Sequence, residues 1–274
     1  MNTKKIGVLI LTAVLLLIGA GSGLAANIVI KGSTTVLPVA QVTMEAFMKA
    51  NPGVNISLSG GGSGEGVKAL IDKTTDIANS SREMKKEEIA LAKSKGSNPK
   101  EIPVAIDAIV PVVNPRNKVS NLTVDQLSQI FQGKITNWKE VGGEDLQIVV
   151  ISRDTSSGTY EAWSELVMKK AKVSPRAQLQ ASSGAIVQAI SKNRYAIGYI
   201  GLGYVDESTK PLTVNGVTAT EKTALDKSFP VSRFLYMYTD GEPKGNVAKY
   251  IAFVLSPEGQ KLVAKEGFVS LPKK

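Results

Sequence analysis

Short apolar runs alternate along this chain with segments whose apolar residues recur every three to four positions. Residues 146–151 are almost wholly apolar and predict a buried strand, and residues 160–170 have the spacing of a helix. Near the start, residues 27–31 predict a strand, and the apolar side chains of residues 36–47 again follow a helical period. Strands that alternate with helices in this way predict an α/β fold whose sheets are mainly parallel.

The remaining segments continue this alternation. Further strands are expected at residues 54–58, 76–79, 102–113, 195–205 and 229–238, and further helices at residues 67–73, 85–95, 122–131, 185–192 and 246–266. Prolines in the apolar run 102–113 discourage a helix, so we expect a strand that passes from one lobe of the protein into another. Asp107 lies within this strand, either as a hinge residue with a buried partner or as a carboxylate that faces solvent.

Four turns between a strand and the following helix are rich in hydroxyl side chains and glycine. They cover residues 32–35, 59–66, 152–159 and 182–184. The first N–H groups of a helix have no partner within the helix and lie at the positive end of its dipole, so such a turn can bind an oxyanion. One such turn could equally be an ordinary serine or threonine N-cap, above all at 182–184. The repetition favours a shared anion site.

The turn at 152–159 carries the most donors. Ser156, Ser157 and Thr159 supply hydroxyls, Gly158 allows a close backbone approach, and Arg153 can make a two-pronged, charge-assisted contact. In the turn at 59–66, Ser63 is flanked by glycines, and the Lys-Ser/Thr ending of a nucleotide-binding P-loop is missing. Ligands of such folds bind beyond the carboxyl ends of the strands, so the turns are expected to surround a small tetrahedral oxyanion.

Residues 1–25 predict a cleaved signal peptide. Lys4 and Lys5 precede an apolar run at 6–18, and small residues at 21–26 offer a cleavage site. The apolar run is shorter than the roughly 20 residues of a spanning helix, so we expect an exported, soluble protein rather than an uncleaved anchor. The sequence contains no Cys, which excludes a lipid-modified N-terminal Cys and favours the periplasm, with secretion into the medium as the alternative.

Composition narrows the functional class. The chain has 33 Lys and Arg against 24 Asp and Glu, but the basic residues are scattered and aromatic residues make up only 5%, so we expect no nucleic-acid partner. There is no His and no Cys, which removes the commonest general base, the thiol nucleophile and the soft metal ligands. We therefore expect a binding protein with no enzymatic activity, no metal site and no cofactor.

The order of these motifs resembles one known family. The motifs are GSTT at 32–35, GGGSGEGVKAL at 60–70, DIANSSRE at 76–83, SRDTSSGT at 152–159, AIGYIGLGY at 196–204 and RFLYMYT at 233–239. This series is similar to that of the phosphate-binding proteins that serve bacterial ABC-type phosphate importers, over essentially the whole mature chain. The resemblance implies a two-lobed periplasmic binding-protein fold of type II, with a ligand cleft between lobes joined by two crossing strands. It also implies delivery of inorganic phosphate to a permease in the inner membrane.

The resemblance further implies a set of phosphate-binding residues. The matched positions are Ser33, Thr34, Thr35, Ser63, Arg153, Ser157, Gly158 and Thr159, and we add Ser81 and Arg82 as candidates where this sequence departs from the family. Many family members carry an aspartate that accepts the proton of phosphate at the position of Ser81. A carboxylate there favours phosphate over sulfate, because sulfate has no proton to donate at neutral pH. We expect phosphate as the ligand, with Asp154 recruited as an acceptor and Arg82 paired with the anion, and sulfate or molybdate as the alternative.

The lobes are expected to close over the ligand about a hinge, in a monomer. The predicted lobe 1 comprises residues 26–106 and 205–274, and the predicted lobe 2 comprises residues 107–204. Two other functional classes stay open on the sequence alone. One is a secreted phosphoester hydrolase on the same scaffold, and the other is a surface that binds polyanions with a steep dependence on salt.

Overall fold

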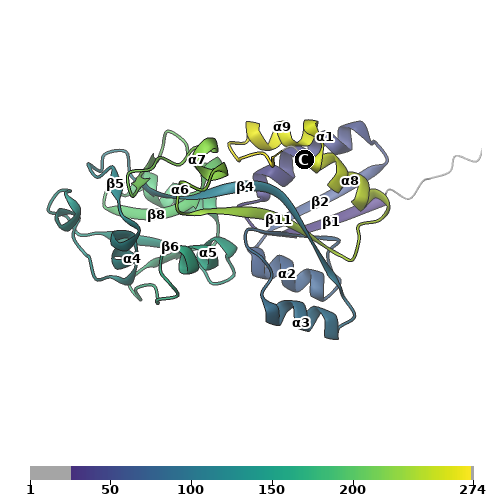
Figure 1. Ribbon diagram of the computed structural model, residues 1–274, viewed down its shortest axis with the longest axis horizontal. Helices are drawn as coiled ribbons and strands as arrows, with labels where there is room; N and C mark the ends of the chain where they lie inside the picture. The colour runs from purple at the N-terminus through teal and green to yellow at the C-terminus, as the bar shows by residue number, and fades with distance from the viewer. Residues whose placement is uncertain (1–25, 273–274) are drawn as a thin grey trace, which may run out of the picture.

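The computed structural model of this protein describes residues 26–272. The predicted signal peptide at 1–25 lies outside the described residues. No helix within 26–272 combines the length and the apolar character needed to cross a membrane. The described chain forms two α/β halves that share one sheet (Figure 1).

The first half is built around three parallel strands. It contains β1 (Ala26–Gly32), α1 (Leu37–Ala50), β2 (Val54–Gly60), α2 (Ser63–Ile71), β3 (Ile77–Ser80), α3 (Lys86–Ser94), α8 (Gly245–Leu255) and α9 (Pro257–Lys265). Helices α1, α8 and α9 cover one face of the sheet, and α2 and α3 cover the other (Figure 1). Alternate strand residues supply the two cores: Ile77 packs on the α1 face, and its neighbour Ala78 packs on the α2 face.

The second half repeats the pattern with shorter elements. It contains β5 (Asn121–Leu122), α4 (Val124–Gln132), the 3₁₀ turn η1 (Trp138–Val141), β6 (Val149–Arg153), α5 (Gly158–Leu166), β7 (Gln178–Gln180), α6 (Ser183–Lys192), β8 (Ala196–Gly201), the 3₁₀ turn η2 (Leu202–Tyr204), β9 (Lys210–Pro211), β10 (Thr213–Val214) and α7 (Glu221–Leu225). Strands β8, β6 and β7 are parallel. Trp163 and Tyr199 stack in the core with ring centroids 4.4 Å apart.

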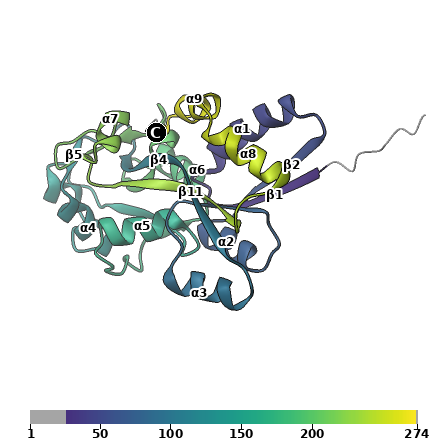
Figure 2. The ribbon, with the colours of Figure 1, turned by 45° about the vertical axis from the view of Figure 1, so that its right-hand side comes forward.

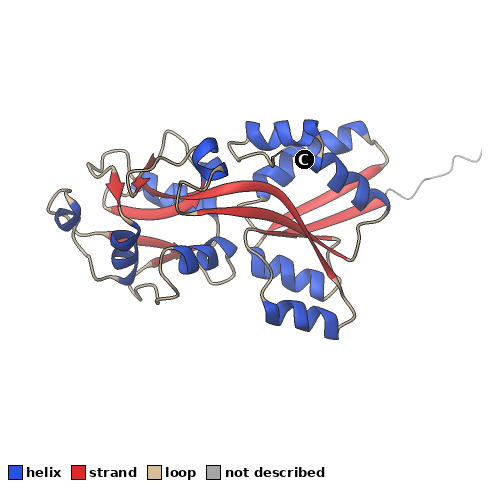
Figure 3. Ribbon diagram, viewed as in Figure 1, coloured by secondary structure: helices blue, strands red, loops and turns tan. Residues whose placement is uncertain are grey.

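Two long strands, β4 (Pro99–Val113) and β11 (Ser232–Asp240), join the halves. They pair antiparallel at the centre of the strand order β2-β1-β3-β11-β4-β8-β6-β7. Figure 3 shows both strands running from one half into the other. The predicted two-lobed α/β fold, with mainly parallel strands in each lobe and two crossing strands, is confirmed.

Residues 205–231 pack with the second half, although the sequence placed them in lobe 1. Leu212, Phe229 and Val231 share a core with Ile109 and Tyr199 of the second half. An apolar pattern shows that a residue is buried but not against which core, so the sequence could not assign this segment. We propose that lobe 2 extends from Asp107 to Val231, with the second crossing at the start of β11.

The predicted C-terminal helix 246–266 is wrong in one respect, because it is two helices. Helix α8 ends at Leu255, and α9 begins at Pro257. Ser256 caps α9 by accepting a hydrogen bond from the amide of Gly259 at 3.1 Å, and Pro257 occupies the first turn, where a missing N–H costs nothing.

Candidate functional site

Four strand-to-helix turns meet at the interface between the two halves. They are the turns before α1, α2, α5 and α6. The Oγ1 atoms of Thr35 and Thr159 are 2.7 Å apart, and the hydroxyl of Ser183 lies 3.5 Å from that of Thr35. These residues are far apart in the sequence, and they meet because each follows the carboxyl end of a parallel strand.

A second group of contacts joins the glycine-rich turn to the end of β3. The hydroxyl of Ser63 lies 3.2 Å from that of Ser81 and accepts the Ser81 amide at 3.0 Å. Gly158 packs directly on this pair. A Cβ atom at Gly158 would lie 2.3 Å from Ser63 Oγ and 2.8 Å from Ser81 Oγ, so no side chain fits there. The glycine therefore allows the turns of the two halves to touch.

We call these residues the hydroxyl cluster. Its members are Thr34, Thr35, Ser63, Ser81, Arg153, Ser157, Gly158, Thr159 and Ser183, and each is buried. Burial of this many polar groups is unfavourable unless their hydrogen bonds are satisfied. The Oγ1 atom of Thr34 finds no hydrogen-bond partner among residues 26–272, so the cluster holds a free donor as it stands. A buried hydroxyl with a free donor can form a hydrogen bond to an oxyanion.

Arg153 is the buried cation of the cluster, with an exposed fraction of 1%. Its Nε donates to the carbonyl of Gln180 at 3.0 Å, and its Nη2 donates to that of Ala181 at 2.9 Å. Its Nη1 donates to Ser183 Oγ at 3.3 Å. No carboxylate within the described range pairs with Arg153. Burial lowers the pKa of this guanidinium, which stays protonated because an arginine side chain keeps its charge in proteins.

The serines of these turns have different roles: some cap a helix or shape a turn, and others belong to the hydroxyl cluster. Ser157 accepts the amide of Tyr160 at 3.2 Å and so caps α5, while its own hydroxyl hydrogen stays available to donate. Ser182 caps α6 by accepting the amide of Ala185 at 3.1 Å. The capping interpretation is therefore right for Ser182, whereas its neighbour Ser183 is a member of the hydroxyl cluster. Ser33 accepts the amide of Thr35 at 3.2 Å and shapes the first turn.

The structure does not bring Arg82 into the hydroxyl cluster, because two carboxylates contact its guanidinium. Nη1 and Nη2 bind the two oxygens of Glu88 at 2.7 and 2.8 Å. Nε lies 2.7 Å from a carboxylate oxygen of Glu161, which belongs to α5 in the other half. Arg82 thus takes part in an ion pair between the halves instead of the hydroxyl cluster.

Asp154 lies in the turn before α5, next to the cluster. Its Oδ1 accepts the amide of Ser156 at 2.8 Å and also the Ser156 hydroxyl. Ser156 in turn donates to the carbonyl of Gly61 at 2.9 Å. This carboxylate therefore orders the turn, and its use as the proton acceptor for phosphate stays a prediction.

Sequence reasoning missed Arg233 as a site residue and left Asp107 undecided. Asp107 is fully buried, and its Oδ2 accepts Arg233 Nη2 at 2.9 Å. The same Nη2 donates to Thr159 Oγ1 at 3.0 Å, so this pair adjoins the cluster. Arg233 opens the motif RFLYMYT, but only the strand register of β11 against β4 places it opposite Asp107. Asp107 therefore has a buried partner and does not face solvent, while its role as a hinge residue stays a prediction.

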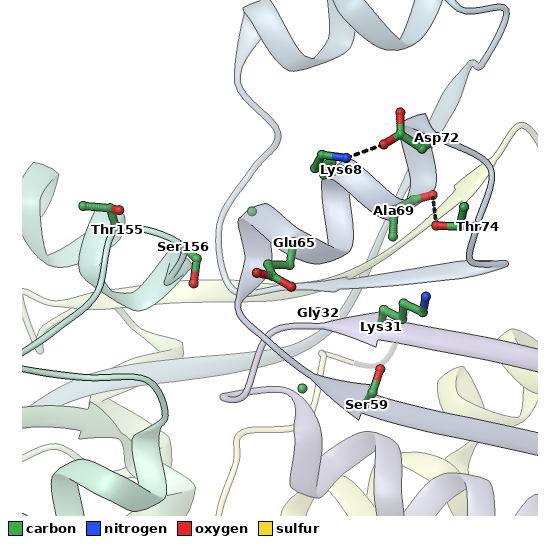
Figure 4. Close-up of a pocket in the computed structure, with 12 residues that line it drawn as sticks. Lys31, Gly32, Ser59, Glu65, Lys68, Ala69, Asp72, Thr74, Thr155 and Ser156 are labelled. Carbon is green, nitrogen blue, oxygen red and sulfur yellow. Dashed lines mark hydrogen bonds and ion pairs between the residues drawn. The ribbon is translucent and has the colours of Figure 1, made fainter.

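A groove of about 620 Å³ opens beside the cluster (Figure 4). Lys31, Glu65 and Lys68 line it from the first half, and Thr155 and Ser156 reach it from the second half. The groove does not include Thr35, Arg153 or Thr159, so it lies next to the hydroxyl cluster and not around it.

The halves touch through their turns. The amide of Gly64 donates to the carbonyl of Ser156 at 2.9 Å, across the interface between the halves. The hydroxyl of Tyr204 also donates to the carbonyl of Thr34. Figure 2 shows α5 of the second half next to α2 of the first. Together with the ion pair between Arg82 and Glu161, these contacts hold the two halves against each other.

Comparison with known proteins decides the family. The profile of the PBP superfamily domain matches residues 19–258. The phosphate-binding protein PstS of Borreliella burgdorferi is 34% identical over 254 residues, which cover 88% of this chain and 89% of that protein. This chain belongs to the phosphate-binding protein family. The PstS protein of Staphylococcus saprophyticus is 36% identical over 257 residues, covering 89% of this chain and 80% of that protein.

The solved structure of one family member has the same fold as this chain. It is a phosphate ABC transporter substrate-binding protein from Clostridium perfringens, determined with phosphate bound, and it is 40% identical to this chain with a TM-score of 0.84. The comparison covers 90% of this chain and all of that one. The family resemblance inferred from the motifs is confirmed.

Proposed function

We propose that this protein binds inorganic phosphate in the hydroxyl cluster and delivers it to the permease of an ABC-type phosphate importer. Relatives at 34% and 36% identity are named phosphate-binding proteins, and the Clostridium perfringens relative holds phosphate. These relatives are binding and transport proteins, so the proposed role involves no catalysis. The proposed phosphate shell comprises the predicted residues Ser33, Thr34, Thr35, Ser63, Ser81, Arg153, Ser157, Gly158 and Thr159, with Ser183 added and Arg82 left out.

The observation that carries this proposal is the burial of Arg153 among hydroxyl donors, with no described carboxylate in contact with its guanidinium. An isolated charge inside a protein is costly, and an anion in contact with the guanidinium offsets that cost. Arg153 lies within hydrogen-bond reach of Ser183, whose hydroxyl is 3.5 Å from that of Thr35. A tetrahedral dianion offers each of these groups an acceptor oxygen.

Sulfate is a specific second candidate because of Ser81. A hydroxyl at this position does not repel a fully ionised oxyanion as a carboxylate does, so rejection of sulfate depends on other groups. Asp154 is the proposed acceptor for the proton of phosphate. If Asp154 serves this role, phosphate and arsenate bind alike and sulfate binds more weakly.

The direct test is calorimetry on the mature protein with phosphate, arsenate, sulfate and molybdate. We expect tight binding of phosphate and arsenate and weaker binding of the other two anions. Sulfate binding that equals or exceeds phosphate binding would contradict the phosphate assignment. Turnover of a chromogenic phosphoester would instead support the hydrolase alternative.

Substitution of Arg153 is the first residue-specific prediction. Arg153→Met should weaken phosphate binding about 100-fold or more, since hydrogen bonds to a charged group contribute about 1.5–3 kcal/mol each and every 1.4 kcal/mol is tenfold in affinity. Arg116→Met is the matched control, because Arg116 is exposed and distant in the sequence from every turn of the cluster. An unchanged dissociation constant for the Arg153 variant would remove Arg153 from the site.

We also propose a periplasmic location, a monomeric state and an inner-membrane permease as partner. Phosphate would hold the two lobes together, and the permease would recognise the closed form. Small-angle scattering tests closure: the radius of gyration should fall when phosphate is added. Identical profiles with and without saturating phosphate would count against this mechanism.

A further inference from the structure

A buried ion pair links the two crossing strands directly behind the hydroxyl cluster. Asp107 on β4 and Arg233 on β11 are opposite each other in the antiparallel register. Nε and Nη2 of Arg233 donate to Asp107 Oδ2 at 3.1 and 2.9 Å. The other carboxylate oxygen accepts the amide of Leu202 at 2.9 Å, so both oxygens of Asp107 are engaged. Asp107 therefore holds Arg233 in one orientation.

The remaining donors of Arg233 point at both halves of the site. Nη1 donates to the carbonyl of Ser81 at 3.0 Å, in the first half, and lies 3.5 Å from the carbonyl of Gly158, in the second half. Nη2 donates to Thr159 Oγ1 at 3.0 Å. One guanidinium thus contacts the turn after β3 and the first turn of α5 simultaneously. Lysine has the same charge but cannot reproduce this planar set of donors.

The contact with Thr159 fixes the direction of its hydroxyl hydrogen. A guanidinium only donates hydrogen bonds, so the oxygen of Thr159 must be the acceptor. Its own hydrogen is then directed away from Arg233, toward Thr35 Oγ1 at 2.7 Å or toward an anion in the cluster. A hydroxyl that is held as a donor suits an oxyanion, since it needs no reorientation when the anion binds.

Asp107 also balances the charge of the site. Without it, Arg233 would be a second buried cation near Arg153, with a full positive charge to offset. With it, Arg153 is the one member of the hydroxyl cluster that carries a positive charge not matched by a described carboxylate. The pair therefore supplies directional donors and adds little net charge.

We propose that Arg233, clamped by Asp107, is a positioning residue for anion binding, which sets Thr159 as a donor and joins the Ser81 and Gly158 turns. This inference rests on the proposed function, because it concerns the same site. Arg233 acts through Thr159 and the two carbonyls, and the anion itself contacts the hydroxyl cluster.

A double-mutant cycle tests this role. Phosphate dissociation constants are measured by calorimetry for the wild type, Arg233→Lys, Thr159→Val and the double variant. We expect Arg233→Lys to weaken phosphate binding about tenfold in the wild-type background, and less than about threefold when Thr159 is already Val. Coupling of this kind distinguishes positioning from general destabilisation, which would weaken binding by the same factor in both backgrounds.

Failure of the positioning role and failure of the proposed function would give different results. Equal factors in the two backgrounds, or unchanged phosphate binding in a folded Arg233→Lys variant, would overturn the positioning role. A wild-type protein that does not bind phosphate would instead defeat the proposed function. If Arg233→Lys does not unfold cooperatively, the variant Asp107→Asn/Arg233→Gln, which leaves no charge at either position of the pair, replaces it with the same expectation.

A surface arginine serves as the control. Arg194 pairs with Glu144 at 2.6 Å at the protein surface and contacts no member of the cluster. Arg194→Lys is the matched substitution and should bind phosphate as the wild type does. A comparable loss in this variant would attribute the effect to the exchange of any arginine for lysine and overturn the assignment to Arg233.

Discussion

Gly158 has no space for even a methyl group, because the turns of both halves meet on it. Its missing Cβ position lies 2.3 Å from Ser63 Oγ. This constraint differs from the flexibility for which glycine is often chosen, since Gly158 is the first residue of α5 and has no unusual backbone angle. The requirement comes from packing between chain segments that are far apart in the sequence.

Gly158→Ala should therefore impair both binding and stability. We expect phosphate affinity to fall at least about tenfold, and stability to fall by roughly 1–3 kcal/mol, as is typical of overpacking. Calorimetry and chemical denaturation measure the two effects. Gly184→Ala is the matched control near the start of α6, where nothing lies within 4 Å of the added methyl group. Wild-type binding by the Gly158 variant would show that the turns can separate without loss of the site.

Arg82 and Arg153 have similar sequence surroundings but different partners in the structure. Arg82 and Arg153 both follow a buried strand and lie next to serines, so the sequence predicts both of them equally as anion ligands. Glu88 and Glu161 neutralise Arg82, and no described carboxylate does so for Arg153. Glu161 lies 79 positions away along the chain, and no local pattern shows that it reaches Arg82.

At the scale of elements, Ser256 both ends α8 and begins α9. Its hydroxyl donates to the carbonyl of Phe253 at 2.6 Å and accepts the amide of Gly259 at 3.1 Å. The break turns the chain so that both helices can pack beside α1 on the same face of the sheet (Figure 1). The Ser-Pro pair was the sequence signal for this break, because proline is favoured in the first turn of a helix.

Ser256→Ala should destabilise the protein by about 1 kcal/mol, the usual cost of removing an N-cap. Urea denaturation followed by circular dichroism measures the change. Ser94→Ala at the exposed end of α3 is the control, with an expected change within about 0.5 kcal/mol. Equal effects of the two substitutions would mean that the cap contributes nothing of its own.

At the scale of the whole molecule, Glu161 connects the two halves. It belongs to α5 in the second half, and it lies 2.7 Å from Arg82 Nε and 3.0 Å from Lys85 Nζ in the first. These pairs exist only when the halves are together. Any interaction made in the closed state alone shifts the equilibrium toward that state.

Glu161→Gln should favour the open form and weaken phosphate binding by up to about fivefold, since such pairs contribute up to about 1 kcal/mol. Scattering without phosphate should show a radius of gyration at least as large as that of the wild type. Glu165→Gln on the same helix is the control, because Glu165 is exposed and its nearest cation is 4.0 Å away. If the two variants bind phosphate equally well, the ion pair has no part in closure.

The sequence by itself determined the α/β class, the positions of most elements, the hydroxyl turns and the family. Each of these depends on local period or on short motifs, which every segment carries in its own residues. The same local signals placed Ser63, Arg153 and Thr159 as candidates for one site.

Only the tertiary structure decided which charged residues form ion pairs and which of the two cores contains residues 205–231. It also decided which groups contact the hydroxyl cluster from the crossing strands. Asp107 and Arg233 are 126 positions apart, and they meet because two crossing strands pair in one particular register. Burial and ion pairing depend on contacts between distant segments. The partner of a charged residue is therefore fixed by the fold and not by its neighbours along the chain.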